Sequence, residues 1–535
     1  MKQTFYLFVL SIFCCLQHSC LPANTENYDI CILGATSAGV AAAYSSKMMG
    51  KSVIIIEPSY HLGGLSSGGL GQTDIGNKMA ITGLARDFYQ RIGKHYGKEE
   101  QWTFEPHVAK QVFQNYLDSA NVQVKYGHQL ISASKQGKEI RTINLLNLAD
   151  SSHHIIGAKM FIDCSYEGDL LAAANITYTI GRESNKQYLE NWNGVQLLDK
   201  HQFPDNIDPY IVKGVPKSGL LWGISNDWLQ PTGSADNKLQ AYNFRLCLTD
   251  SLENSVAITK PEGYDSTQFE LLLRYIEKKK PKELNWALMH IQPMPGRKTD
   301  INNSGPFSTD MIGANYQYPE ASYAERLEII NAHKKYTLGL LYFLGHDIRV
   351  PKHLRNEMLK YGLAKDEFTD TDNFTPQLYI REARRMVSDY VMTESHCIGQ
   401  DVVTDPIGMA AYTMDSHNCQ RIVINGMVKN EGDVQKGLGG LAPYPISYRS
   451  IIPKKAECSN LLVPVCLSAS HIAFGSIRME PVFMVLGQSA GVAASLAINH
   501  GVELTDLDVK IIQKELTNNP TADRRTSKYP FKTAH

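Results

Sequence analysis

The chain has 535 residues, of which 43% are hydrophobic and 20% charged, and its formal net charge at pH 7 is −1. These values are typical of a globular protein large enough for two domains, and they exclude a disordered or low-complexity chain. Because the near-zero charge offers no basic surface, no nucleic-acid partner is expected.

The first 20 residues have the pattern of an export signal. Lys2 supplies a positive charge, and the apolar run over residues 5–16 is too short to span a bilayer. Cys20 stands where a bacterial lipoprotein carries its acylated cysteine, although Gln17 replaces the usual leucine; cleavage near Ala23 by an ordinary signal peptidase is the alternative. We expect an exported protein, periplasmic or anchored to the outer membrane, that touches the membrane only through such a lipid.

Residues 28–57 have the order of a dinucleotide-binding β-α-β unit. An apolar strand leads into a glycine-rich turn, an alanine-rich helix follows, and a second apolar strand ends at Glu57. Gly34 permits the tight turn, and Gly39 lets the helix pack closely on the sheet. Glu57 lies where a carboxylate accepts hydrogen bonds from an adenosine ribose. Thr36 replaces the middle glycine of the usual motif, so an ordinary β-α-β unit is the alternative.

A second glycine-rich stretch indicates which nucleotide is bound. Ser37 and Ala38 open the predicted helix, where backbone amides face a pyrophosphate. Gly63 and Gly64 begin a glycine-rich run (63–71) immediately after the second strand. A nicotinamide site has no common need for such a run, whereas the pyrophosphate and ribityl chain of a flavin need close backbone approach. The sequence therefore predicts FAD rather than NAD.

Two later segments are predicted to complete the FAD site. Residues 161–169 form an apolar strand that ends in a glycine-containing turn. Its candidate cofactor contacts are Asp163, Gly168 and Asp169. Gly487 and Gln488 are interpreted as the start of a small-residue helix, whose positive end suits the flavin edge that gains negative charge on reduction. A surface connection and an alanine-rich packing helix are the respective alternatives.

Together with residues 298–303 and 471–481, these segments resemble the bacterial FAD-dependent oxidoreductase family, which belongs to the two-glycine, glutathione-reductase-like flavoproteins. The similarity runs from about Tyr28 to Asn499. The resemblance implies an α/β fold in which a Rossmann-like FAD-binding domain carries an inserted α+β substrate domain. It implies little about the substrate, because members of this family are mostly named by fold.

The inserted domain is expected where glycine turns become rare and aromatic, Asn, Asp and His residues become frequent. The expected divisions are a signal at 1–20, the first part of the FAD-binding domain at 27–177, a mainly substrate domain at 178–397, the closing part of the FAD-binding domain at 398–505 and a C-terminal tail at 506–535.

Oxidation of a C–H bond by a flavin needs a base and polar groups that fix the donor. His471, which follows the last predicted strand of the FAD-binding domain, is the first candidate for this base, and His417, close to Asp415, is the second. Arg449 and Arg478 are candidates for binding an oxygen-rich substrate or for stabilising reduced flavin. Each histidine is explained as well by a structural role, and Arg478 by an ion pair with the nearby Glu480.

A polar patch and several tryptophans are candidates for contacts with hydroxyl groups and sugar rings. The patch consists of Asp300, Asn302 and Asn303, for which a turn that satisfies its own backbone is the alternative. The tryptophans that could stack on a sugar, or fill a core, are Trp222, Trp228 and Trp286. No spacing of metal ligands is present, so no metal is expected.

The sequence thus predicts an exported FAD-dependent oxidoreductase that moves a hydride from a polar CH–OH donor, with a carbohydrate-derived compound as the leading candidate, to flavin N5. The expected partners are this small molecule and a separate electron acceptor. The alternatives are a flavin enzyme without net oxidation, such as an isomerase or an eliminating enzyme, and a surface glycan-binding protein that has lost redox activity.

Overall fold

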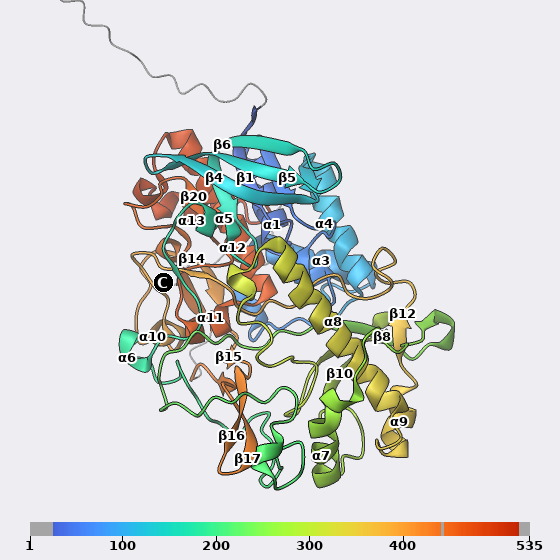
Figure 1. The fold of residues 1–535 in the computed structure, drawn as a ribbon. Coiled ribbons are helices and arrows are strands. Elements are labelled where there is room, and N and C mark those ends of the chain that lie inside the picture. The colour runs from blue at the N-terminus through green and yellow to red at the C-terminus, as the bar shows by residue number, and fades with distance from the viewer. Residues whose placement is uncertain (1–24, 440–442, 524–535) are drawn as a thin grey trace, which may run out of the picture.

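The computed structural model describes residues 25–439 and 443–523. The predicted export signal and Cys20 lie outside these residues, as does the end of the predicted tail. The described chain forms two hydrophobic cores, one around a parallel sheet and one around an antiparallel sheet (Figure 1).

The first sheet has seven strands and is built from both ends of the chain. Its parallel strands are β3 (Gln123–Tyr126), β2 (Val53–Glu57), β1 (Thr25–Leu33) and β6 (His153–Asp163), in that order, with β20 (Leu461–Leu462) beside the end of β6. Antiparallel β5 (Glu139–Asn147) and β4 (His128–Gln136) extend it. Leu33 pairs with both Ile56 and Asp163, so β1, β2 and β6 end at the same edge. Ligands of open α/β sheets bind at such an edge.

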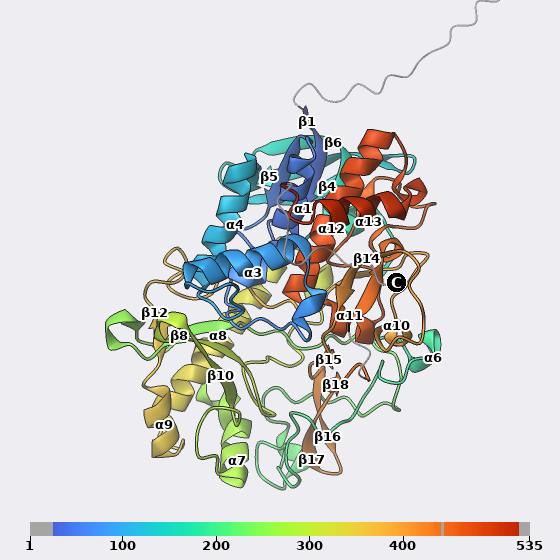
Figure 2. The ribbon, with the colours of Figure 1, turned by 180° about the vertical axis from the view of Figure 1, so that it is seen from behind.

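The first and the last long helices of this half lie side by side (Figure 2). They are α1 (Ser37–Met48) and α12 (Glu480–His500). A Cβ at Gly487 would lie 2.3 Å from the Ala38 carbonyl oxygen, and one at Gly491 would lie 2.4 Å from that of Ala42. Glycine at both positions therefore lets the two backbones touch.

The position of α12 corrects one prediction from the sequence. Gly487 and Gln488 lie inside α12 rather than at its start, because Pro481 in the first turn marks a helix that begins at Glu480. By length and composition α12 is the described helix that could cross a membrane, but 89% of its apolar window is buried, as in a core helix of a soluble fold.

Further helices complete this half of the molecule. They are α2 (Gly64–Ser67), α3 (Gly83–His95), α4 (Pro106–Ala120), α5 (Asp169–Ala173), α10 (Glu394–Cys397), α11 (His471–Ile477) and α13 (Val509–Asn518). Helix α13 falls in the segment predicted as a tail, yet it packs on α12 and buries Ile512 and Leu516. This part of the predicted tail is therefore a structural element of the half that holds the parallel sheet.

The second core surrounds a five-stranded antiparallel sheet. Its strands, in spatial order, are β10 (Met289–Met294), β11 (Lys298–Asn303), β8 (Leu246–Thr249), β12 (Gly362–Ala364) and β9 (Ser255–Val256). The helices beside it are α7 (Glu270–Lys279), α8 (Tyr323–His346) and α9 (Lys352–Met358). Ser322 and Glu325 form a reciprocal capping box that fixes the start of α8.

Four short antiparallel strand pairs of the described chain lie outside the two large sheets. They are β7 (Tyr178–Thr179) with β13 (Arg385–Met386), β14 (Pro406–Ala410) with β19 (Tyr444–Ser447), β15 (Met414–Ser416) with β18 (Val434–Lys436), and β16 (Gln420–Ile424) with β17 (Met427–Glu431). The sequence assigned the last pair to the FAD-binding domain, but Val428 is buried in the second core and its amide donates to Ile207 O at 3.0 Å. The closing segment therefore returns to the substrate half before the chain ends.

Candidate functional site

The turn after β1 is shaped for a phosphate-bearing ligand. Gly34 has a φ of +96°, and a Cβ there would lie 2.9 Å from the Cys164 carbonyl. A Cβ at Gly39 would lie 1.9 Å from Gly34 O, so neither position tolerates a side chain. Within the described chain, the amides of Ser37 and Ala38 donate no hydrogen bond, although both residues are buried. These two donors at the start of α1 suit a pyrophosphate.

Thr36 and Glu57 complete this turn. Thr36 Oγ1 accepts from the Gly39 amide at 3.2 Å and donates to Cys164 O at 2.9 Å, so the residue that departs from the usual motif caps α1 and ties it to β6. Glu57 accepts from the Ala35 amide at 2.7 Å at the end of β2, and burial raises its pKa. A carboxylate, a glycine turn and two spare amides fit the AMP half of FAD.

The glycine-rich run after Glu57 is pressed against other parts of the chain. Gly63 and Gly64 have φ values of +92° and +54°, and Cβ atoms there would lie 2.4 Å from the Phe113 ring and 2.3 Å from the Tyr166 hydroxyl. Packing within the protein therefore accounts for these glycines, in addition to the close cofactor approach that the sequence suggested.

Glu480 is a residue of this region that the sequence analysis did not assign to the site. Its carboxylate accepts from the hydroxyls of Ser37 at 2.6 Å, Ser66 at 2.7 Å and Tyr166 at 2.6 Å. Burial raises its pKa. The carboxyl group thus joins α1, α2 and the turn after β6 at the start of α12. The sequence signal that could have identified Glu480 is an acidic residue directly before a proline at the start of an apolar helix.

The turn after β6 holds its predicted residues in structural roles. Asp163 accepts from Ser165 Oγ at 2.6 Å and from the Leu171 amide at 2.9 Å, and burial raises its pKa to about 6. Gly168 has a φ of +71° and caps α5. Asp169 pairs with two arginines of the substrate half, which fixes the two halves together instead of leaving a carboxylate for the cofactor. These arginines are Arg326, at 2.7 Å, and Arg384, at 2.9 Å.

Gln488 also has a packing role. Its Oε1 accepts from the Leu84 amide at 2.8 Å, and its Nε2 donates to Pro520 O at the same distance. The side chain therefore links α12 to α3 and to the end of the described chain, and the interpretation of Gly487 and Gln488 as cofactor contacts is not supported by their positions.

A polar cavity of about 540 Å³ opens where the two halves meet. Its lining includes four candidates from the sequence: His417, Asn302, Asn303 and Trp286. Further lining residues that matter below are Asp74, Arg245, Tyr379, Tyr412 and Asp415.

Two connections place the cavity next to the turn after β1 (residues 34–39), which is called the FAD turn below. Asp74 closely follows the glycine-rich run, and Gly69 in that run packs so tightly that a Cβ would lie 2.0 Å from Arg245 O. On the other side, Arg478 contacts the cavity residue Asp415 and is two positions from Glu480, which contacts α1.

His417, which lies on the cavity wall, forms an oriented pair with the carboxylate of Asp310. Its Nδ1 lies 2.8 Å from Asp310 Oδ2, and its Nε2 lies 3.7 Å from Asp415 Oδ2. Burial and the charge of Arg381 oppose protonation of the ring, but the two carboxylates outweigh them and raise its pKa. Arg381 in turn holds Asp310 at 2.9 Å. The pair can therefore take up a proton from a ligand in the cavity.

Tyr379 is a second polar residue of this wall, and Arg478 contacts it. Arg478 Nη1 donates to the Tyr379 hydroxyl at 2.9 Å, and Nη2 lies 3.2 Å from Asp415 Oδ2. The partner of Arg478 is thus Asp415 and not Glu480. Although burial raises the pKa of Asp415, His417 and Arg478 together hold it below its usual value, so this carboxylate stays charged.

Asp300 does not line the cavity, but it holds a residue that does. It accepts from Arg245 Nε at 2.8 Å and from the Gln72 amide at 2.8 Å. Arg245 itself lines the cavity and also lies 3.6 Å from Asp74. Asp300 is therefore a buried counterion that fixes Arg245, while Asn302 and Asn303 of the predicted patch reach the cavity.

One described group of metal-ligand type lies elsewhere, and it already surrounds a cation. The group consists of Glu105, His107 and Glu367, whose possible ligand atoms lie within 4.8 Å of one another. Lys298 Nζ lies 2.8 Å from Glu105 and 2.7 Å from Glu367, so its ammonium occupies the acidic centre of the group.

A family model described as FAD dependent oxidoreductase matches residues 29–516. The chain belongs to this family. Its expected α/β architecture with a Rossmann-like FAD-binding sheet is confirmed, and its cofactor is FAD. The protein is therefore an FAD-dependent oxidoreductase, and the turn at Gly34 and the carboxylate of Glu57 are the residues that fit this cofactor.

Comparison with other known proteins adds little beyond the fold. No curated protein matches the chain. Solved structures with partial similarity include OxyS anhydrotetracycline hydroxylase from Streptomyces rimosus, 12% identical with a TM-score of 0.24 over 33% of this chain and 36% of that one. A flavoprotein/dehydrogenase from Cytophaga hutchinsonii is 14% identical, with a TM-score of 0.22 over 29% of this chain and 43% of that one. The oxidoreductase covers less than half of either protein, and such low scores carry no argument about its activity.

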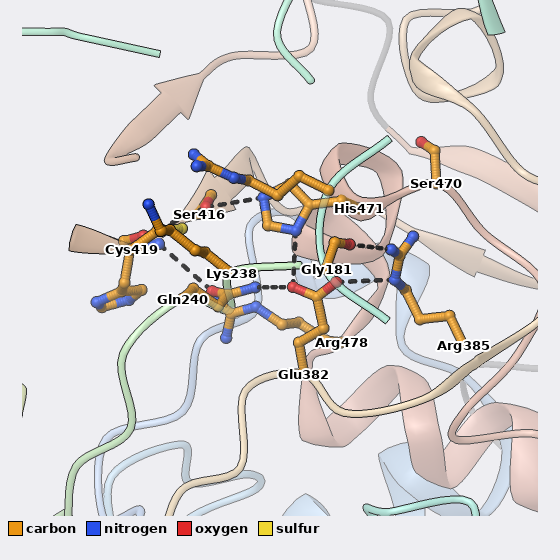
Figure 3. Close-up of polar contacts among 12 residues, drawn as sticks. Gly181, Lys238, Gln240, Glu382, Arg385, Ser416, Cys419, Ser470, His471 and Arg478 are labelled. Atoms are coloured by element: carbon orange, nitrogen blue, oxygen red, sulfur yellow. Dashed lines mark hydrogen bonds and ion pairs between the residues drawn. The ribbon is translucent and has the colours of Figure 1, made fainter. Parts of the chain in front are cut away.

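His471, the first candidate base, is enclosed by the oxidoreductase itself (Figure 3). Its Nδ1 lies 2.7 Å from Glu382 Oε2 and its Nε2 lies 3.0 Å from Ser416 Oγ, so both ring nitrogens have partners. Glu382 also pairs with Arg385 at 2.7 Å, and although burial opposes its ionisation, His471 and Arg385 lower its pKa to about 2. The geometry therefore favours His417 as the base, the reverse of the order that the sequence suggested.

Arg449 does not line the cavity of the oxidoreductase. It lies 3.1 Å from Asp405 and its guanidinium carbon is 4.2 Å from the centre of the Tyr390 ring, with the side chain about half exposed. These contacts give it a local structural role and do not support its assignment to catalysis.

Proposed function

We propose that this oxidoreductase oxidises a polar CH–OH donor of carbohydrate type, with His417 as the base. The observation that carries the proposal is His417 on the wall of a polar cavity beside the FAD turn, held from within the protein by the buried Asp310. FAD, when bound, would supply the hydride acceptor for the donor's C–H bond, at its N5.

The residues around His417 support the other half of this reaction. Asp310 holds Nδ1, which fixes the tautomer and leaves Nε2 to take the hydroxyl proton of the donor. Arg478 donates to the Tyr379 oxygen, so the hydroxyl hydrogen of Tyr379 is directed elsewhere and can bind a donor oxygen. The charges of Asp415 and Arg478 balance each other, and the wall therefore does not require a charged donor.

A carbohydrate fits this cavity better than an apolar compound does. Amide, hydroxyl and carboxylate groups dominate the residues that form its wall, and such groups bind hydroxyls by hydrogen bonds in both directions. Oxygen, a quinone or another carrier would be the second partner in this proposal, as the acceptor of the two electrons.

The decisive experiment is the visible spectrum of the anaerobic holoenzyme during addition of neutral sugars and sugar acids. We expect at least one of them to bleach the flavin band, and His417→Gln to slow bleaching while the band itself remains. His353→Gln, a change at an exposed histidine of α9, is the matched control. Bleaching by His417→Gln at the rate of the unaltered enzyme would contradict the role of His417, and a flavin that no sugar reduces would contradict the donor class.

We also propose that the enzyme is exported and anchored through Cys20, on the evidence of the N-terminal sequence alone. Fractionation of cells is expected to place the protein in the membrane fraction, and Cys20→Ser to release it or leave its signal uncleaved. Recovery of the unaltered protein with the cytoplasmic enzymes would refute export.

A further inference from the structure

Trp286 is an exposed aromatic residue on the wall of the cavity. Its relative exposure is 64%, whereas that of His417 on the same wall is 7%, so the indole lies towards the open side and the base towards the buried side. Soluble proteins expose isolated large apolar side chains without consequence, but an indole at the mouth of a polar cavity is in contact with whatever enters.

The backbone of Trp286 is held in a conformation that a bulky residue rarely adopts. Its φ is +64°, in the left-handed region. Its amide donates to Met289 O at 2.7 Å and its carbonyl accepts from Ser304 Oγ at 2.6 Å, so the surrounding loop fixes the turn. Backbone strain of this kind collects at functional sites, where the position of a side chain matters more than local stability.

His290 supports one face of the indole and leaves the other open. The two ring centres lie 3.6 Å apart with the planes inclined by 31°. Burial and then the charge of Arg245 lower the pKa of His290, so it is neutral at pH 7. The indole therefore does not have a cation on its covered face, and its open face is a flat apolar surface.

The cavity that Trp286 lines also contains unpaired amides. His290 and Gln292 are two positions apart on β10 and point to the same side of the sheet. Within the described chain the side chains of Gln292, Asn303 and Gln435 make no hydrogen bond, although all three line the cavity. Each amide can donate and accept at once, which is what a ring of hydroxyl groups needs.

The other two candidate tryptophans lack these features. Trp222 stacks on Tyr336, with ring centres 5.4 Å apart, and Trp228 is 74% exposed but does not line this cavity. Of the three, Trp286 alone combines an open face, a fixed backbone and adjacent free amides.

We propose that Trp286 is the platform for a second sugar ring, so that the oxidoreductase acts on a glycoside of at least two units. The inference rests on the proposed carbohydrate oxidation and adds a binding site to it. The reacting unit lies at the buried end beside His417, and the next unit stacks on the open face of Trp286 with its hydroxyls at Gln292, which shares a face of the sheet with His290.

The test measures binding without turnover. The photoreduced, anaerobic holoenzyme is titrated calorimetrically with maltose, cellobiose and lactose, and with glucose and galactose as their single units. We expect at least one disaccharide to bind more tightly than its single unit, by about three- to tenfold, which is the range for one aromatic stacking contact. Trp286→Ala is expected to remove this difference and leave the affinity for the single sugar unchanged. Trp228→Ala, which alters an exposed indole outside the cavity, is the matched control.

Each result decides the proposal. Equal affinities for disaccharide and single sugar, equal losses for both in Trp286→Ala, or no binding of any of these sugars would overturn it. A disaccharide that binds through Trp286 but never bleaches the oxidised flavin leaves the platform in place and refutes the proposed oxidation. If a single sugar bleaches the flavin and Trp286→Ala changes no sugar affinity, the proposed oxidation stands and the platform is refuted.

Discussion

Replacement of Asp310 by asparagine tests how the cavity prepares its base. Asp310 Oδ2 lies 2.8 Å from His417 Nδ1, and both side chains are buried. The substitution keeps the shape of the side chain and removes one negative charge, so the imidazolium form of His417 loses its nearest counterion. Arg381 loses Asp310 as its ion-pair partner, and its positive charge acts on His417 in the same direction.

The size of the effect follows from this geometry. An opposite charge at such a distance raises the pKa of a histidine by roughly 1–3 units, which corresponds to about 1.4–4 kcal/mol between its two protonation states. In the unaltered enzyme the pKa of His417 is raised, so the neutral, proton-accepting ring is lost as the pH falls through that raised value. In Asp310→Asn the pKa is lower, so the acid limb of the rate moves to lower pH by about the same 1–3 units. The plateau at high pH also falls, because a weaker base removes the hydroxyl proton less readily.

The assay is the rate of flavin bleaching in an anaerobic stopped-flow instrument, with the best donor from the sugar panel, over about pH 5 to 9. Asp199→Asn serves as the control, since Asp199 lines the exposed side of the same cavity and pairs with no described cation. An acid limb that stays in place in Asp310→Asn would show that another group titrates, and the assignment of His417 as the base would fall.

Two further predictions concern cofactor retention and stability. Gly39→Ala is expected to yield protein without the visible flavin band, because the new Cβ would lie 1.9 Å from a backbone oxygen of the FAD turn; Gly437→Ala, with no atom within 4 Å of its Cβ, should stay yellow. Asp300→Ala leaves Arg245 as a buried charge with only a distant partner, so denaturant titration should show a loss of about 3–5 kcal/mol in the free energy of unfolding. Asp250→Ala removes an exposed ion pair and should cost about 0–1 kcal/mol; a larger loss there than at Asp300 would contradict this reasoning.

Local patterns in the sequence predicted the first β-α-β unit and its glycine turn. Gly34, Gly39 and Glu57 belong to one continuous β-α-β unit, whose residue spacing sets their positions on the strands and the helix. Even Thr36, the departure from the motif, has a local explanation as the cap of α1.

The catalytic side of the site could not be predicted in the same way, because it depends on contacts between distant segments. Asp310 is 107 positions from His417, and no local pattern joins them. His471 was ranked first for its place after a strand, and only its contacts with Glu382 and Ser416 show that the ring is enclosed. The start of α12 was misplaced because small residues around Gly487 outweighed the proline signal at Pro481.

The contact between α1 and α12 has a consequence for the order in which the protein matures. Helix α1 begins at residue 37, and its partner is complete only at residue 500, so most of the chain must be synthesised before the two can meet. Until then Ala38 and Ala42 lack the glycine surface that covers them, and Ser37 lacks the carboxylate of Glu480. Closure between such distant segments is slow compared with local folding. Uptake of FAD is therefore a late step, which follows release of nearly the whole chain from the ribosome.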